Sequence, residues 1–206
     1  KADESNKKTR PMKKILKKVN TENIGELEEA GKNLRDMIKN ADIPEDLERQ
    51  ILTAFKKLNC RFVAVRSSAT AEDLPSASFA GQQESFLNIK GHDLIKCVKN
   101  CFASLFTNRS ISYRVDKGFN HFKVFISVGV QKMIESQASG VMFTIDPDSG
   151  HDKFIFINAG YGLGEFIVQG KIDPDEYYVH KPTKSIISKK LGKKKVMAVR
   201  DKFRIF

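Results

Sequence analysis

Arg66 and the hydroxyl and glycine residues that follow it are the part of this sequence best suited to binding phosphate. Arginine carries a planar, permanently charged fork of donors that can hold two phosphate oxygens at once. Ser67, Ser68 and Thr70 add short hydroxyl donors, and Gly81 permits the dihedrals by which successive backbone N–H groups point at one anion. The stretch matches neither GxxxxGK[ST] nor GxGxxG. A strand followed by a solvated turn and a glycine loop is an equal alternative.

A second candidate is Glu165, which follows the glycine-rich sequence Gly160-Tyr-Gly-Leu-Gly164. This sequence also differs from the dinucleotide fingerprint GxGxxG. A carboxylate beyond a flexible turn can bind ribose hydroxyls or help to hold a metal, and a structural role is the equal alternative. Asp173 and Asp175 are less specific, and we expect solvated turn carboxylates there.

A short buried strand is expected to position Arg66, because residues 62–65 form the continuous apolar run of a strand covered on both faces. Further helices are expected over residues 93–106 and 108–117. From residue 123, β-rich runs separated by Gly, Pro, Asp and Ser predict a largely antiparallel sheet to residue 191, and hence an α+β fold. Two amphipathic helices are expected before the strand, with apolar faces formed by Leu27, Ala30, Leu34, Met37 and Ile38, and by Leu47, Ile51, Ala54, Phe55 and Leu58.

The net charge of +11 is concentrated at the two ends of the 206-residue chain. Residues 1–20 carry +6 and residues 181–206 carry +9, whereas residues 21–180 carry −4. A slightly acidic body with basic ends argues against nucleic-acid binding, and the basic runs lack the interleaved aromatic residues that stack on single strands. We expect residues 1–20 to be a flexible lead-in.

The three cysteines, Cys60, Cys97 and Cys101, follow no metal-binding or disulfide pattern, so we expect reduced core cysteines. No apolar run is long enough for a membrane helix, and no signal peptide is recognisable. A soluble cytoplasmic protein without membrane partners is the default expectation.

The sequence from residue 63 to 88, VAVRSSATAEDLPSASFAGQQESFLN, resembles the nucleotide-binding domain of phosphoenolpyruvate synthase (pyruvate, water dikinase). The resemblance covers about residues 43–192. Further segments follow in the order of that family and at similar spacing: ASLFT, ISYR, VQKMI, GVMFT, YGLGE, VQG and PDEYYVHKPT.

The resemblance implies an ATP-grasp-like arrangement of two lobes with ATP between them. The first lobe is expected over residues 21–122, with the phosphate-binding segment at 61–88, and the second over 123–191, leaving 192–206 as a basic end of a truncated domain. Arg66 is expected to contact the triphosphate, Gly81 to contribute backbone N–H groups and Ser85, in place of the usual threonine, to donate a hydroxyl. Gln131 and Met133 are expected beside adenine, where an apolar surface and a polar partner suit the base.

Several family segments have no counterpart in this chain: the Gly-Gly-Lys segment, the acidic strand with Gln-x-Arg, the phosphohistidine segment and the pyruvate-binding barrel. The four histidines, His92, His121, His151 and His180, stand in other contexts and are expected to be structural or solvated. We therefore expect a fragment that binds nucleotide weakly or not at all and does not turn over. In the full enzyme, ATP with Mg2+ would phosphorylate a histidine of another domain, and the phosphoryl group would pass to pyruvate.

Two alternatives stay open at this point. The first is the ATP module of a related dikinase, such as a rifampicin phosphotransferase, over which PDEYYVHKPT favours the synthase. The second, of another class, is a noncatalytic module that binds nucleotide or nucleic acid.

Overall fold

The structure is a computed structural model that describes residues 2–69, 73–74, 77–78, 85–198 and 203–205, with side chains for residues 9–69 and 85–197. The chain divides into two compact units, Lys1–Met133 and Ile134–Phe206, which are described separately below. Helices and antiparallel strands occur together, so the α+β class predicted from the sequence is confirmed. No described helix combines the length with the apolarity that crossing a bilayer requires.

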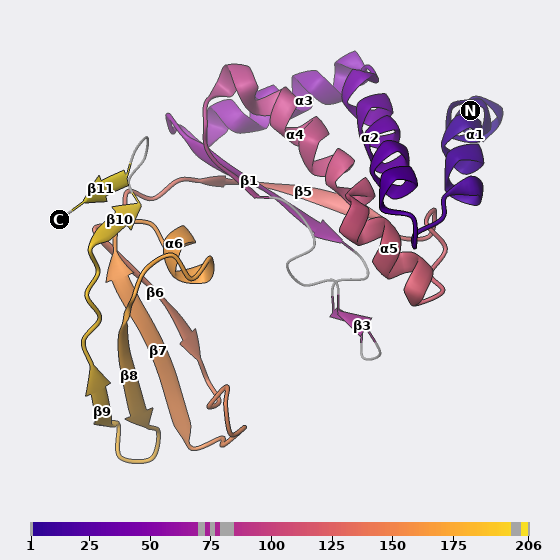
Figure 1. The fold of residues 1–206 in the computed structure, drawn as a ribbon. Helices are drawn as coiled ribbons and strands as arrows, with labels where there is room; N and C mark the ends of the chain where they lie inside the picture. Colours follow the sequence, from indigo (N-terminus) through magenta and orange to yellow (C-terminus); the bar gives the residue numbers. More distant parts are fainter. Residues whose placement is uncertain (1, 70–72, 75–76, 79–84, 199–202, 206) are drawn as a thin grey trace. The chain divides into compact units, whose positions relative to one another are not determined.

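The first unit contains the longer helices and a three-stranded antiparallel sheet in the order β4-β1-β5 (Figure 1). Its helices are α1 (Ala2–Lys18), α2 (Ile24–Asn40), α3 (Glu45–Lys57), α4 (Leu94–Ala103) and α5 (Asn108–Asp116), with short 3-10 turns η1 (Gly91–Asp93) and η2 (Ser104–Phe106). Its strands are β1 (Val63–Ala69), β4 (Ser85–Ile89), β5 (Ile126–Lys132) and a two-stranded pair, β2 (Asp73–Leu74) with β3 (Ala77–Ser78).

Capping side chains fix where two of these helices begin. The Asn23 side chain accepts a hydrogen bond from the Glu26 backbone N–H at 3.3 Å, and its amide donates to the Glu26 carboxylate at 3.0 Å. Thr107 Oγ1 likewise accepts from the Ser110 N–H at 3.2 Å. Each cap satisfies a backbone donor that the first turn of a helix leaves without an intrahelical partner.

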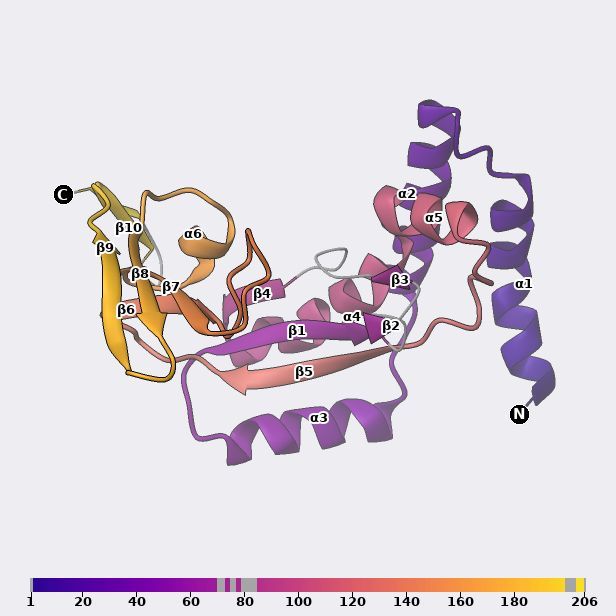
Figure 2. The ribbon, with the colours of Figure 1, turned by 90° about the horizontal axis from the view of Figure 1, so that it is seen from below.

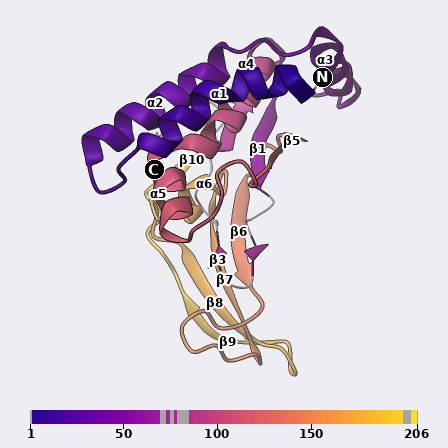
Figure 3. The same cartoon turned by 90° about the vertical axis from the view of Figure 1, so that its right-hand side faces the viewer.

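The lysine-rich start of the chain was expected to be a flexible lead-in. The structure shows that it forms the helix α1 instead. Met12, Ile15, Leu16 and Val19 recur at helical spacing and pack against a core cluster made by Leu27, Leu34, Phe106 and Ile111. Figure 3 shows α1 running alongside α2. This apolar stripe explains why the segment is helical although it is dense in charge.

The main core of the first unit lies between one face of the sheet and the helices α3 and α4. Val63 and Val65 of β1 are fully shielded and pack against Leu94 and Val98 of α4. Cys97 and Cys101 belong to the same cluster, with partly buried Ile51, Leu52 and Phe55 of α3 beside it. Figure 1 shows α3 and α4 on the same side of β1 and β5.

The second unit is built around a four-stranded antiparallel sheet in the order β6-β7-β8-β9. Its elements are β6 (Ala138–Phe143), β7 (Phe154–Tyr161), α6 (Glu165–Val168), β8 (Asp175–His180), β9 (Ser185–Lys190) and the pair β10 (Val196–Ala198) with β11 (Phe203–Ile205). These strands agree with the antiparallel sheet expected in this half of the chain.

The division of the chain differs from the expected boundary at residues 122 and 123. Strand β5 was assigned to the second lobe, but it pairs with β1 along its whole length, from Ile126 opposite Ala69 to Lys132 opposite Val63. The first unit therefore extends to Met133. The pairing joins segments about sixty residues apart, which local sequence patterns do not encode.

Candidate functional site

Arg66 lies in the central strand of the first unit, with a polar residue opposite it on one side and a glycine on the other. In the strand register, Arg66 stands opposite Ser85 of β4 and Gly129 of β5. Directly opposed residues in antiparallel strands project from the same face of a sheet, so the Arg66 and Ser85 side chains share one face. Both are exposed, and within the described ranges the Arg66 guanidinium has no ion-pair partner.

Gln131 and Met133 belong to the same face of the sheet as Arg66. Gln131 stands opposite Ala64, two residues from Arg66, and the Met133 N–H donates to the Phe62 carbonyl at 3.0 Å. Alternation along a strand places every second residue on one side. The core residues Val63 and Val65 therefore point to the helices, and Arg66 and Gln131 point away from them.

We refer to this side of the sheet, which carries Phe62, Arg66, Ser85, Gln131 and Met133, as the Arg66 face. Figure 2, seen from below, shows strands β1 and β5 in front of α4, so α4 lies behind the strands. The structure thus brings together four of the six residues expected to bind nucleotide. They come from three strands that lie far apart in the sequence.

Gly129 leaves space on the Arg66 face at the position directly opposite Arg66. A Cβ atom built on Gly129 would have its nearest neighbour, the Arg66 carbonyl oxygen, at 3.9 Å. A larger residue at this position would add a side chain to the Arg66 face opposite Arg66. Its absence keeps this position open to a ligand.

The remaining expected site residues are not on the described part of this face. Gly81 and Thr70 lie outside the described residues. Glu165 belongs to the second unit, where it is the first residue of α6, is exposed, and accepts a hydrogen bond from the Gln169 side chain at 3.0 Å. Ser67 projects toward the helices, because it stands opposite Val128 and one residue out of phase with Arg66.

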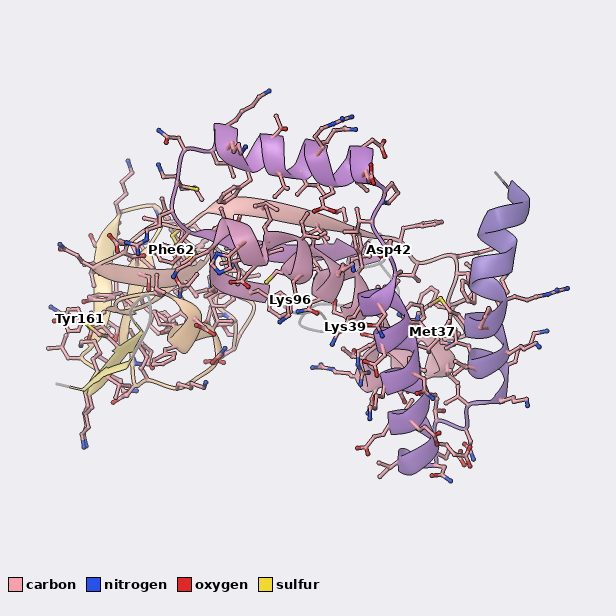
Figure 4. All side chains as sticks on the ribbon, turned by 90° about the horizontal axis from the view of Figure 1, so that it is seen from above. Met37, Lys39, Asp42, Phe62, Lys96 and Tyr161 are labelled. Atoms are coloured by element: carbon pink, nitrogen blue, oxygen red, sulfur yellow. The ribbon has the colours of Figure 1, made fainter. Side chains whose placement is uncertain are left out.

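Phe62 is a residue of the Arg66 face that the sequence analysis did not single out. It is 6% exposed, and the cations of Arg61 and Lys90 lie 5.2 and 5.8 Å from its ring centroid. Phe62 is labelled in Figure 4. The sequence could have predicted this position, because alternation along a strand puts Phe62 and Arg66 on one face.

The two aspartates before β8 and at its start have structural partners. Asp175 accepts hydrogen bonds from the Gly192 N–H at 2.9 Å and from the Lys194 ammonium, and Asp173 accepts from the Lys193 N–H at 3.1 Å. The bond from Lys194 is the main reason that the pKa of Asp175 lies below its usual value. These carboxylates tie residues 192–194 to the strand, which differs from the solvated turn expected there.

Metal binding finds little support among the described side chains. No group of three or more histidine, cysteine, aspartate or glutamate residues converges in the described ranges. The donors present therefore do not form a protein site that would hold Mg2+ by itself. All three cysteines are free, and burial raises the pKa of the Cys97 thiol, as expected of reduced core cysteines.

A sheet face that combines an exposed guanidinium, a hydroxyl, an amide and apolar surface has the groups found in nucleotide-binding proteins. The comparisons with known proteins agree with this class. The chain belongs to the family described as pyruvate phosphate dikinase, AMP/ATP-binding domain, which matches residues 3–204.

Three similar proteins are all named phosphoenolpyruvate synthase. The chain is 51% identical over 197 residues to a phosphoenolpyruvate synthase of Aquifex aeolicus, covering 89% of this chain and 23% of the relative. It is 48% identical to the phosphoenolpyruvate synthase of Neisseria meningitidis and 47% identical to that of Escherichia coli, covering 89% and 90% of this chain and 25% of each relative. The chain therefore spans about a quarter of the length of these relatives.

Proposed function

We propose that this chain is the ATP-binding portion of a phosphoenolpyruvate synthase. The observation that carries the proposal is the Arg66 face, on which Arg66, Ser85, Gln131 and Met133 share one side of a sheet. The family match and the names of the relatives support the same function.

Each group on this face has a role that follows from its chemistry. Arg66 binds the triphosphate of ATP through charge-assisted hydrogen bonds, and Ser85 donates its hydroxyl to the same oxygens. Gln131 and Met133 meet the base, the amide at its polar edge and the thioether on its apolar surface. By the family resemblance, we add backbone N–H groups around Gly81 and a ribose contact from Glu165.

In the whole protein, we propose that ATP phosphorylates a histidine of another domain of the parent chain. The histidine passes its phosphoryl group to pyruvate on a further domain, and water takes the other phosphate. The products are phosphoenolpyruvate, AMP and inorganic phosphate. Mg2+ would enter with the phosphates of ATP, since the described residues alone do not form a site for it. Three free cysteines support a reducing, cytoplasmic location.

A titration of ATP into the isotope-labelled chain, followed by nuclear magnetic resonance, tests the assignment. We expect weak saturable binding that shifts the amide signals of Arg66, Gly129 and Gln131. Arg66→Ala should weaken binding by roughly tenfold to a hundredfold, because charged hydrogen bonds contribute about 1.5–3 kcal/mol. Arg49→Ala is the matched control, since Arg49 is an exposed arginine on α3 and outside the Arg66 face.

Three outcomes would contradict the proposal. They are a lack of saturable shifts at millimolar ATP, equal affinity of the Arg66→Ala and Arg49→Ala variants, and shifts confined to the helices α3 and α4. We also expect no phosphoenolpyruvate from ATP and pyruvate with this chain alone. Its formation here would show that the acceptor domains are not needed.

A further inference from the structure

A hollow of about 370 Å³ lies where α1 passes the segment between α5 and β5 in the first unit. It is lined by Lys13, Leu16, Lys17, Asn120, His121 and Phe122. Figures 1 and 2 both show this segment passing close to α1. None of these residues belongs to the Arg66 face. We call the cavity the Lys17 hollow.

The polar side chains that line the Lys17 hollow offer hydrogen-bond donors. Arg114 Nε donates to His121 Nδ1 at 2.9 Å, so Nδ1 acts as the acceptor and a neutral ring carries its proton on Nε2. Asn120 Oδ1 accepts from the Phe122 N–H at 2.9 Å, which leaves the Asn120 NH2 group to donate. The two lysines add ammonium donors.

The charge around the hollow is positive. Lys13 and Lys17 are four residues apart on one face of α1, where like charges repel each other. No acidic side chain is among the residues that line the hollow. The Lys13 ammonium lies 5.6 Å from the centroid of the Phe122 ring, so an aromatic surface adjoins the cation.

Arg114 adds a buried cation next to His121. It is fully shielded from solvent, and both of its terminal nitrogens, Nη1 and Nη2, are buried without a hydrogen-bond partner among the residues that the structure describes. The guanidinium lies 5.3 Å from the centroid of the Phe106 ring, which is a weak partner for a full charge. An anion in the neighbouring hollow would compensate part of this uncompensated positive charge.

We propose that the Lys17 hollow binds the phosphate group of a small organic phosphate. The phosphate oxygens accept hydrogen bonds from Lys13, Lys17 and His121, and the organic part packs on Leu16 and Phe122. A carboxylate has only two oxygens for this set of donors, whereas a phosphate has three or four. The hollow is also large enough for more than the phosphate alone.

The pH dependence of binding follows from the groups that face the ligand. His121 accepts a hydrogen bond from Arg114 and lines the same hollow as Lys13 and Lys17, and burial together with Arg114 lowers the pKa of His121 to about 4. The ring is therefore neutral at neutral pH and acts as a donor without charge. The ligand itself titrates, with a second phosphate pKa of about 6. Affinity should rise between about pH 5.5 and 8, whereas a site that needs a charged histidine would lose affinity.

Titrations of phenyl phosphate and of inorganic phosphate at constant ionic strength test the proposal, with the signals of Asn120, His121 and Phe122 as the readout. We expect saturable shifts that Lys13→Gln/Lys17→Gln weakens by roughly tenfold or more. Lys14→Gln/Lys18→Gln is the matched control, because it removes the same charge from the same helix at the same spacing outside the hollow. The control should change affinity less than about twofold.

The two probes distinguish the sources of the phosphate group. Tighter binding of phenyl phosphate identifies an organic phosphate, and equal affinities identify free phosphate at the same site. The proposal is overturned if neither probe saturates, if chloride causes the same shifts, or if both double variants bind alike.

Discussion

The burial of His121 beside Arg114 makes the stability of the first unit depend on pH in a window that can be stated in advance. Burial first, and Arg114 second, lower the pKa of His121 from 6.5 to about 4. The unfolded chain therefore binds a proton between these values that the folded chain does not bind. Stability contributed by the neutral ring is present above about pH 6.5 and is lost as the pH falls toward 4.

The size of the effect follows from the two pKa values of His121. For a ring removed from solvent, they correspond to about 2 kcal/mol of unfolding free energy lost between pH 7 and pH 5. Because His121 is only partly buried, solvent screening reduces this figure by about half. We therefore expect a loss of about 1 kcal/mol from this residue.

Urea unfolding at pH 7 and pH 5 measures the loss, with His121→Gln as the comparison. Glutamine keeps an oxygen that can accept the hydrogen bond from Arg114 Nε, but its side chain does not titrate. The carboxylates titrate in both proteins, so their contribution cancels in the comparison. The parent chain should lose about 1 kcal/mol more than the variant between the two pH values. Equal losses in both proteins would refute the reasoning, and a smaller loss in the parent would show that the ring is charged in the folded state.

Three further predictions concern packing and local structure, each measured as the change in urea unfolding free energy. Leu34→Ala should cost about 3–5 kcal/mol, because Leu34 is fully shielded in its cluster and a cavity would replace it; a loss below about 1 kcal/mol would contradict this packing. Asn23→Ala should cost about 1 kcal/mol by removing the cap that accepts from the Glu26 N–H, whereas Asn23→Asp should keep most of the stability. Gly140→Ala should destabilise the second unit, since the added Cβ would lie 2.6 Å from the Asn158 carbonyl oxygen, and wild-type stability would show that β6 and β7 can separate there.

Local patterns in the sequence predict the helices of the first unit from α2 onward, but not α1. The spacing of Leu27, Ala30 and Leu34 predicts the buried face of α2, and the structure buries all three. The same reasoning applied to Met12, Ile15, Leu16 and Val19 would have found α1, but the many lysines of that segment obscured its apolar stripe. Charge density alone is a poor sign of flexibility when the apolar residues keep a helical period.

The pairing of β1 with β4 and β5 could not be predicted from local patterns in the sequence. The run at residues 62–65 correctly predicts a strand covered on both faces, since all four residues are buried, but it does not show which face packs against the helices. Val63 and Val65 enter the core, while Phe62 and Arg66 lie on the opposite face. Which residues stand opposite Arg66 depends on the register of β4 and β5, and so does the grouping of the candidate site.

The burial of Arg114 was equally beyond reach from the sequence. A single arginine on a short helix is more often a structural contact than a ligand, but the sequence does not show that the structure shields Arg114 completely. The sequence leaves open whether its partner His121 is structural or solvated, and the hydrogen bond to Arg114 agrees with a structural role. Only the tertiary packing of α5 shows that these two residues form a buried pair.

Because the three thiols differ in burial, their rates of chemical labelling can report the opening of the core. Cys101 is completely shielded and Cys97 nearly so, whereas Cys60 lies at the margin of the same cluster. A thiol-labelling reagent should therefore modify Cys60 in the native state and reach the other two after α4 separates from β1. The delay between the modification of Cys60 and that of Cys97 and Cys101 then measures how slowly α4 separates from β1, and no engineered probe is needed.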